Sequence, residues 1–229
     1  MKIASNIIKE HLKNVLFISG GAYGGKTTMA KLIEERYGIV RYREGDHIDA
    51  HIAYADEQHQ PVMCSYRERS KFTYDDWNNY YNQEVHLEDA YRRLKAGSDE
   101  VAEMAIVDLI KLSQHQRVVA DVMIPVETLK KIADYHQVVL LYAPVKMKRA
   151  HYYDREDKRY IIEHMMTMQN PEKVVQNCLD VLTYNGEEEI EAFKQSGFKC
   201  IERSETPNIE TVLEEIATHF GLCRNGIVA

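Results

Sequence analysis

Residues 20–28, GGAYGGKTT, place four glycines in six positions directly before Lys26, Thr27 and Thr28. Glycine tolerates positive φ, so successive backbone N–H groups in such a stretch can turn inward and form a concave anion site. An ammonium and a hydroxyl beside that hollow could bind a phosphate and a divalent cation. A bare turn would explain the glycines, but it would not explain Lys26 and Thr27 at their positions.

The spacing of this stretch fits the pattern G-x-x-x-x-G-K-[ST], from Gly20 to Thr27. In that pattern the backbone cradles phosphates, Lys26 reaches the β- and γ-phosphates, and the Thr27 hydroxyl coordinates Mg²⁺. The partial positive charge of a helix N-terminus favours the same ligand. The residues expected to bind the nucleotide are Gly20, Gly21, Ala22, Tyr23, Gly24, Gly25, Lys26, Thr27 and Thr28.

This stretch needs a strand before it and a helix after it. Apolar runs rich in Val and Ile at 15–19, 39–43, 117–121, 137–142 and 198–202 predict strands that are buried on both faces. A helical pattern follows each run. The first helix covers 26–37 and ends at Gly38, Pro125 opens a helix over 125–136, and Thr206 with Pro207 opens the last helix. We therefore expect a doubly wound α/β fold with a parallel five-stranded sheet.

Two stretches interrupt the alternation, within what we expect to be a single domain over 1–229. Residues 44–114 hold a polar segment and then helices at about 75–95 and 98–113, separated by Gly97 with Ser98 as N-cap. Residues 146–185 begin with many Lys and Arg residues and continue into two helices that meet at Asn170 and Pro171. Interruptions of a regular scaffold are where function is usually found.

On these residues and their strand–loop–helix context, the sequence resembles the P-loop NTPases. The resemblance implies a second magnesium ligand, an acidic residue at the end of a neighbouring strand, and Asp121 stands there. Its alternative role is a cap on the turn before Pro125. The sequence lacks the N/T-K-x-D motif of Ras-type GTPases, and too few residues remain for the second domain of an AAA-type motor. Residues 44–114 and 146–185 resemble the acceptor-binding insert and the lid of nucleoside-monophosphate and small-molecule kinases.

In a lid, Arg149 and Arg155 are expected to neutralise charge on the transferred phosphoryl group. The interleaved acids Asp154, Glu156 and Asp157 leave a second interpretation open, a solvated face whose charges pair with one another.

The first insert is expected to hold the phosphate acceptor. Small-molecule kinases of this superfamily have a Gly-Asp pair after the second strand, which implies Asp46 as general base, with Asp49 as its competitor. A helix N-cap is an equally good role for Asp46. Arg67 and Arg69 could clamp a phosphate or carboxylate of the acceptor, or could belong to a basic surface loop.

Aromatic side chains gather just after these arginines. Trp77, Tyr74, Tyr80 and Tyr81 could stack on a nucleobase, but aromatic residues at helical spacing favour a core role. The loop 203–208 corresponds in position to the segment with which these kinases hold the base, mostly through backbone contacts. ATP is the default nucleotide.

The composition of the chain argues against two classes of partner, nucleic acids and membranes. A net charge of −7 and a pI near 5.8 argue against nucleic-acid binding, and no apolar run is long enough to span a membrane. The N-terminal residues do not resemble a signal peptide, and four scattered cysteines favour a reducing cytoplasm. The sequence leaves open whether the protein forms a homodimer.

The predicted function is transfer of the γ-phosphate of ATP, with Mg²⁺, to a small molecule. The alternative is a regulatory ATPase or binding module that acts on a protein partner.

Overall fold

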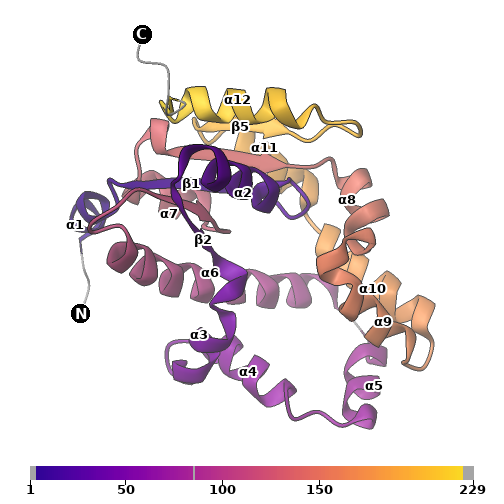
Figure 1. Ribbon diagram of the computed structural model, residues 1–229. Helices are drawn as coiled ribbons and strands as arrows, with labels where there is room; N and C mark the ends of the chain where they lie inside the picture. Colours follow the sequence, from indigo (N-terminus) through magenta and orange to yellow (C-terminus); the bar gives the residue numbers. More distant parts are fainter. Residues whose placement is uncertain (1–3, 85, 224–229) are drawn as a thin grey trace. The chain divides into compact units, whose positions relative to one another are not determined.

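The computed structural model describes residues 4–84 and 86–223 (Figure 1). Contacts within the chain divide it into two compact units. The sheet unit comprises residues 4–48, 101–143 and 188–223, and the helical unit comprises 49–84, 86–100 and 144–187. The helical unit is therefore built from the two stretches that interrupt the strand–helix alternation in the sequence.

The sheet unit contains five parallel strands in the order β2-β3-β1-β4-β5. Their bounds are β1 Val15–Gly20, β2 Val40–Arg43, β3 Val118–Asp121, β4 Val138–Tyr142 and β5 Lys199–Glu202. Central β1 is buried along its whole length, and its Phe17 is in register with Ala120 of β3 and Val138 of β4. Near-continuous hydrophobicity predicts this burial, and the predicted α/β fold with a five-stranded parallel sheet is confirmed.

Helices α2 (Lys26–Tyr37) and α12 (Ile209–His219) cover one face of the sheet (Figure 1). Their Ile33 and Ile216 join Ile18 and Leu141 in one core cluster. The other elements with residues in this unit are α1 Ser5–His11, η1 Glu44–Asp46, α7 Val126–Ile132, η2 Tyr135–Gln137, and parts of α6 Leu87–Leu112 and α11 Gly186–Lys194.

The ends of two helices test the capping predictions. Helix α2 ends at Gly38 as predicted, because glycine there adopts a left-handed φ of 64° and its N–H donates to the Glu34 carbonyl. The predicted start of α12 at Thr206 and Pro207 was wrong. Asn208 is the N-cap, and its side-chain oxygen accepts a hydrogen bond from the Thr211 N–H at 3.1 Å.

The helical unit holds α3 Ile48–Tyr54, α4 Pro61–Arg69, α5 Tyr74–Asn82 and the first half of α6, followed by elements of its second stretch. Those are α8 Val145–His151, η3 Tyr152–Asp154, η4 Glu156–Lys158, α9 Arg159–Met166 and α10 Pro171–Thr183. The joint predicted at Asn170 and Pro171 is confirmed. None of the helices in the described part of the chain is both long and apolar enough to cross a membrane.

The predicted helix break at Gly97 was wrong, because α6 runs through this residue without interruption. Glycine serves close packing there. A Cβ on Gly97 would lie 2.9 Å from the Tyr66 hydroxyl and 3.0 Å from a methyl group of Val62, so its absence lets α4 approach α6. One turn further on, the buried Glu100 carboxylate accepts hydrogen bonds from the N–H groups of Val62 and Met63 and thereby caps α4.

Candidate nucleotide-binding site

The loop 20–25 connects the end of β1 to the start of α2. Positive φ angles occur at Gly20 (109°), Tyr23 (67°) and Gly25 (95°), so the backbone turns sharply three times within six residues. At Gly20 and Gly24, the packing of the loop requires glycine. A Cβ at either position would overlap the backbone of Leu141 in β4, against which the loop is pressed. The glycines predicted for an anion site thus also fasten this loop to the sheet.

Lys26, the first residue of α2, reaches back over the loop. Its ammonium donates a hydrogen bond to the Gly21 carbonyl at 2.8 Å, while the Gly21 N–H donates to the Leu141 carbonyl at 2.9 Å. The loop therefore carries a positive charge at the N-terminal end of a helix of 12 residues, where the backbone dipoles add to the same field. This is an environment that attracts phosphate oxygens. Thr27 and Thr28 follow in the first turn of α2.

Arg203, which directly follows β5 and is distant in the sequence, contacts the loop. Its guanidinium donates to the Tyr23 carbonyl at 3.0 Å and lies 4.1 Å from the centre of the Tyr23 ring. Its own N–H donates to the Tyr142 carbonyl at 2.8 Å, which continues the line of β5 beside β4. Tyr23 is a non-glycine residue with positive φ, a conformation that costs about 1–2 kcal/mol, and the Arg203 contacts offset part of this. The position of this loop could be predicted from the sequence, but the side-chain contact to Tyr23 could not.

Asp121 ends β3 beside β1, in register with Ile18, two residues before the loop begins. It is 6% exposed, and no hydrogen bond to its carboxylate is found among the residues that the structure describes. The turn after β3 is closed by other groups. Ser19 exchanges hydrogen bonds of 3.2 Å with the backbone of Ile124, and Glu44 accepts one from the Met123 N–H at 2.9 Å. The capping role considered for Asp121 is thus filled by Ser19 and Glu44.

The oxygen donors suit Mg²⁺. A hydroxyl at the start of α2 and one carboxylate at the end of β3 are hard ligands, and Mg²⁺ usually keeps several waters and needs only one or two carboxylates. Within the described residues there is no cluster of three or more His, Cys, Asp or Glu side chains that could hold a metal ion by itself. The set fits a cation that is shared with phosphate oxygens.

The sheet, the loop and the lysine combine into one arrangement. A parallel sheet has β1 at its centre, a glycine loop follows β1, and a lysine opens the next helix. This arrangement resembles the fold of the P-loop NTPases. No protein-family model matches the sequence, and no curated protein is significantly similar to it. Among solved structures, the chain is similar to a shikimate kinase from Acinetobacter baumannii in complex with shikimate, with 15% sequence identity and a TM-score of 0.44. The likeness covers 93% of this chain and 95% of that one, and it concerns the course of the chain.

Asp46 lies at the end of η1 in the sheet unit. It is exposed, and its carboxylate accepts a hydrogen bond from Arg43 at 3.1 Å. Arg43 is in register with Asp121, so the Asp46 segment continues from the strand that borders β3. Asp46 does not directly precede α3, which begins at Ile48, and the alternative role as a helix N-cap is not seen.

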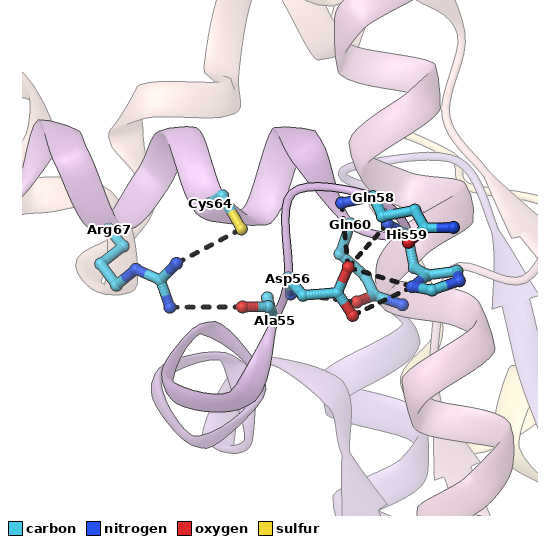
Figure 2. Close-up of polar contacts among 7 residues, drawn as sticks. All are labelled: Ala55, Asp56, Gln58, His59, Gln60, Cys64 and Arg67. Atoms are coloured by element: carbon cyan, nitrogen blue, oxygen red, sulfur yellow. Dashed lines mark hydrogen bonds and ion pairs between the residues drawn. The ribbon is translucent and has the colours of Figure 1, made fainter.

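The candidates Asp49, Arg67 and Arg69 lie in the helical unit. Asp49 is exposed in the first turn of α3. Arg67 donates to the Ala55 carbonyl at 3.3 Å and to the Cys64 sulfur at 3.4 Å (Figure 2). It also donates to the Ile52 carbonyl at 3.3 Å. These contacts satisfy carbonyls at the end of α3, so Arg67 fixes α3 to α4. Arg69, two residues further, faces a cavity that is described below.

The loop between α3 and α4 is held by its own side chains (Figure 2). The Asp56 carboxylate accepts hydrogen bonds from the N–H groups of Gln58 and His59, and the His59 ring lies 3.0 Å from it. The hydrogen bond with the His59 ring, followed by those from the backbone, lowers the pKa of Asp56 below its usual value. The polar residues of this segment thus have a local structural role.

Arg149 and Arg155 also lie in the helical unit. Arg149 joins α8 to α10, because it donates to the Asp180 carboxylate at 2.5 Å and to the Thr183 hydroxyl at 3.0 Å. Arg155 donates twice to Asp157, at 2.7 and 2.9 Å. Arg155 is therefore paired with one of the interleaved acids, as in the second interpretation of the sequence, whereas Arg149 pairs with Asp180, which lies outside that segment. A catalytic role for either arginine requires it to exchange these partners for phosphate oxygens.

Proposed function

We propose that the protein is a P-loop kinase that transfers the γ-phosphate of ATP, with Mg²⁺, to a small-molecule acceptor. The observation that carries this proposal is the loop 20–25, with its lysine folded over it and a buried carboxylate at the end of the adjacent strand. A triphosphate placed on this loop meets backbone N–H groups, the helix N-terminus and the Lys26 ammonium. Catalysis of phosphoryl transfer consists mostly of such positioning and charge neutralisation.

The proposal assigns one task to each residue. Lys26 neutralises charge on the β- and γ-phosphates, and Thr27 with Asp121 holds the Mg²⁺ hydration shell. Asp46 accepts the proton of the attacking hydroxyl, for which it must release Arg43. Arg149 and Arg155 stabilise the transferred group when the lid closes, and Asp49, Arg67 and Arg69 belong to the acceptor side.

The compartment and partners follow from the same proposal. All four cysteines are described, and they form no disulfide with one another. This fits a reducing compartment, and we place the protein in the cytoplasm with small-molecule rather than nucleic-acid or membrane partners.

A panel of small hydroxylated and phosphorylated metabolites tests the kinase assignment. ADP production is measured with Mg²⁺ and ATP, and each acceptor is compared with water alone. The proposal expects at least one acceptor to raise ADP production well above the water-only rate and to appear as a phosphorylated product. The Lys26→Ala variant serves as the inactive control. ADP formation that is equal with every acceptor and with water would contradict the kinase assignment.

The ion pairs of the lid arginines favour one second candidate, a regulatory ATPase or binding module. Arg149 forms an ion pair with Asp180, and Arg155 forms one with Asp157. Arg67 donates hydrogen bonds to backbone carbonyls. Three arginines predicted to bind phosphate or acceptor thus make contacts within the helical unit. In that candidate, ATP is hydrolysed slowly and a protein partner binds only the ATP-loaded form. Slow hydrolysis without any acceptor effect, together with nucleotide-dependent capture of one purified partner, would support it.

A further inference from the structure

The helical unit contains a cavity of about 530 Å³, and its lining includes Arg69, which the proposed function places on the acceptor side. All of its lining residues belong to this unit, from α4, α5, α6, η3, α9 and α10 and from the segment between α5 and α6. Its size lies within the range of small-molecule sites, which is roughly 300–1,000 Å³. A molecule with one or two fused rings would fit such a volume.

Tyrosines form much of the wall, namely Tyr66, Tyr80, Tyr81, Tyr152 and Tyr153. Their rings meet edge to face, with centres 5.4 Å apart for Tyr80 and Tyr81 and 5.1 Å apart for Tyr152 and Tyr153. Rings in this arrangement offer both faces and edges to a further flat ring. The sequence favours a core role for the aromatic residues near Trp77, and the structure gives two of them a second role as cavity wall.

A second layer holds this wall in place. Trp77 stacks on Tyr81 with ring centres 5.4 Å apart and an interplanar angle of 21°, and it meets Tyr80 edge to face at 5.8 Å. Trp77 and Tyr81 pack in turn against the buried cluster of Met165, Met168 and Val174. The tyrosines are thus fixed before any ligand binds, which lowers the entropic cost of binding.

Arg69 brings a positive charge to this wall. Its guanidinium lies 4.4 Å from the centre of the Tyr66 ring and donates to the Tyr80 hydroxyl at 2.8 Å. Its Nε donates to the Ser65 carbonyl at 3.4 Å, and none of the described residues hydrogen-bonds to its Nη2. A planar guanidinium held in this way can present an N–H group to a carboxylate or phosphate oxygen.

The other charged groups at the cavity do not cancel the attraction of Arg69 for an anion. Arg93 of α6 also lines it, and no ion pair of Arg93 is found within the described residues. Of the acids, Asp89 is already paired with Arg92 at 3.0 Å, and Glu84 lies exposed. Burial raises the pKa of Tyr81 to about 12 and that of Cys178 to about 11, and it also raises the pKa of Tyr152 and Tyr153. The walls therefore carry neutral hydroxyl and thiol groups at pH 7, and they add no negative charge.

We propose that this cavity binds a planar aromatic molecule with one acidic group, whose ring lies against the tyrosines and whose acid pairs with Arg69. This proposal rests on the proposed function in one respect, since it refines the place of Arg69 on the acceptor side, but binding by the helical unit does not require kinase activity. Binding without nucleotide tests it, whereas ADP production tests the proposed function, so either can fail alone.

The experiment is isothermal titration calorimetry of the full-length protein, without nucleotide, against four matched probes. 2-Naphthoate carries both features, 2-naphthamide lacks the charge, decahydro-2-naphthoate lacks the aromatic ring, and 2-naphthylmethylammonium reverses the charge. We expect 2-naphthoate to bind about tenfold or more tightly than each of the other three, which corresponds to one charged hydrogen bond or to the stacking contribution. Equal binding of all four, tighter binding of the ammonium probe, or no binding of 2-naphthoate would overturn the proposal.

Variants locate the binding. Arg69→Gln should weaken 2-naphthoate about tenfold or more and leave 2-naphthamide unchanged, and Arg69→Lys should restore part of the loss. Lys95→Gln is the matched control, because Lys95 is exposed on α6 and pairs only loosely with Asp99 at 3.9 Å. Far-UV circular dichroism checks that each variant folds. If Arg69→Gln does not fold, the probe comparison on the wild-type protein decides alone. An unchanged affinity in a folded Arg69→Gln variant would refute the assignment.

Discussion

Gly24 offers a sharp test of the way the loop is fastened to the sheet. In Gly24→Ala, the added Cβ would lie 2.6 Å from the Leu141 carbonyl carbon and 2.9 Å from the Tyr142 nitrogen. Non-bonded carbon atoms prefer roughly 3.5–4.0 Å, so the loop must move by about 1 Å. The neighbours are backbone atoms of buried β4 and cannot turn aside. We expect a loss of about 3 kcal/mol in the free energy of unfolding, the upper end for overpacking.

Gly38→Ala is the matched control for this substitution. Gly38 also has a positive φ, but a Cβ there would meet no atom within 4 Å, and the residue lies at the far end of α2. Backbone strain alone should cost about 1–2 kcal/mol. Urea unfolding followed by far-UV circular dichroism measures both variants, since the only tryptophan, Trp77, belongs to the helical unit and does not report on the sheet unit.

The two variants should also differ in ATP affinity. Moving the loop by about 1 Å breaks the convergence of its N–H groups, so Gly24→Ala should weaken ATP at least tenfold, by analogy with the steep cost of small misplacements at a site. Gly38→Ala should bind ATP like the wild type. A Gly24→Ala protein with wild-type stability and wild-type ATP affinity would refute the packing of this loop against Leu141.

Four further substitutions address the proposed lid, the proposed general base and a half-buried histidine. Arg149→Ala should lower kcat more than it lowers ATP affinity. Asp180→Asn breaks the same ion pair and should leave kcat unchanged. Equal losses of kcat in the two variants, measured by steady-state kinetics, would show that the pair is structural. Asp46→Asn should suppress phosphoryl transfer with little change in ATP affinity by calorimetry, and full activity would move the base to Asp49 or to none. Burial, chiefly, lowers the pKa of His219 below its usual 6.5, so the folded state binds fewer protons than the unfolded chain near that pH. Stability should therefore fall as the pH drops through 6.5, and His219→Gln should flatten this part of the urea-midpoint profile; an unchanged profile would exclude His219 as its cause.

The sheet could be predicted from the sequence because its signals are local. Each strand is a near-continuous apolar run, and each predicted range agrees with the structure to within one residue at either end. The loop 20–25 could be predicted for the same reason, since its glycines, Lys26 and Thr27 are neighbours in the chain.

The remaining features depend on contacts between distant residues. Gly97 reads as a helix break, yet its function is to make room for Tyr66 and Val62 of α4. Arg203 contacts Tyr23 although the two are 180 residues apart in the sequence, and no local pattern predicts such a pair. The cavity in the helical unit likewise joins tyrosines from both of its stretches, so only the folded chain shows them as one wall.

Calorimetric titration of Mg·ATP into the wild-type protein and into Lys26→Ala measures whether the loop 20–25 binds a triphosphate. Adenosine and tripolyphosphate serve as partial ligands. We expect ATP and tripolyphosphate to bind, adenosine to bind far more weakly, and Lys26→Ala to lose about tenfold or more in ATP affinity. If ATP does not bind, or if it binds no better than adenosine and equally well to Lys26→Ala, the loop 20–25 is not a triphosphate site.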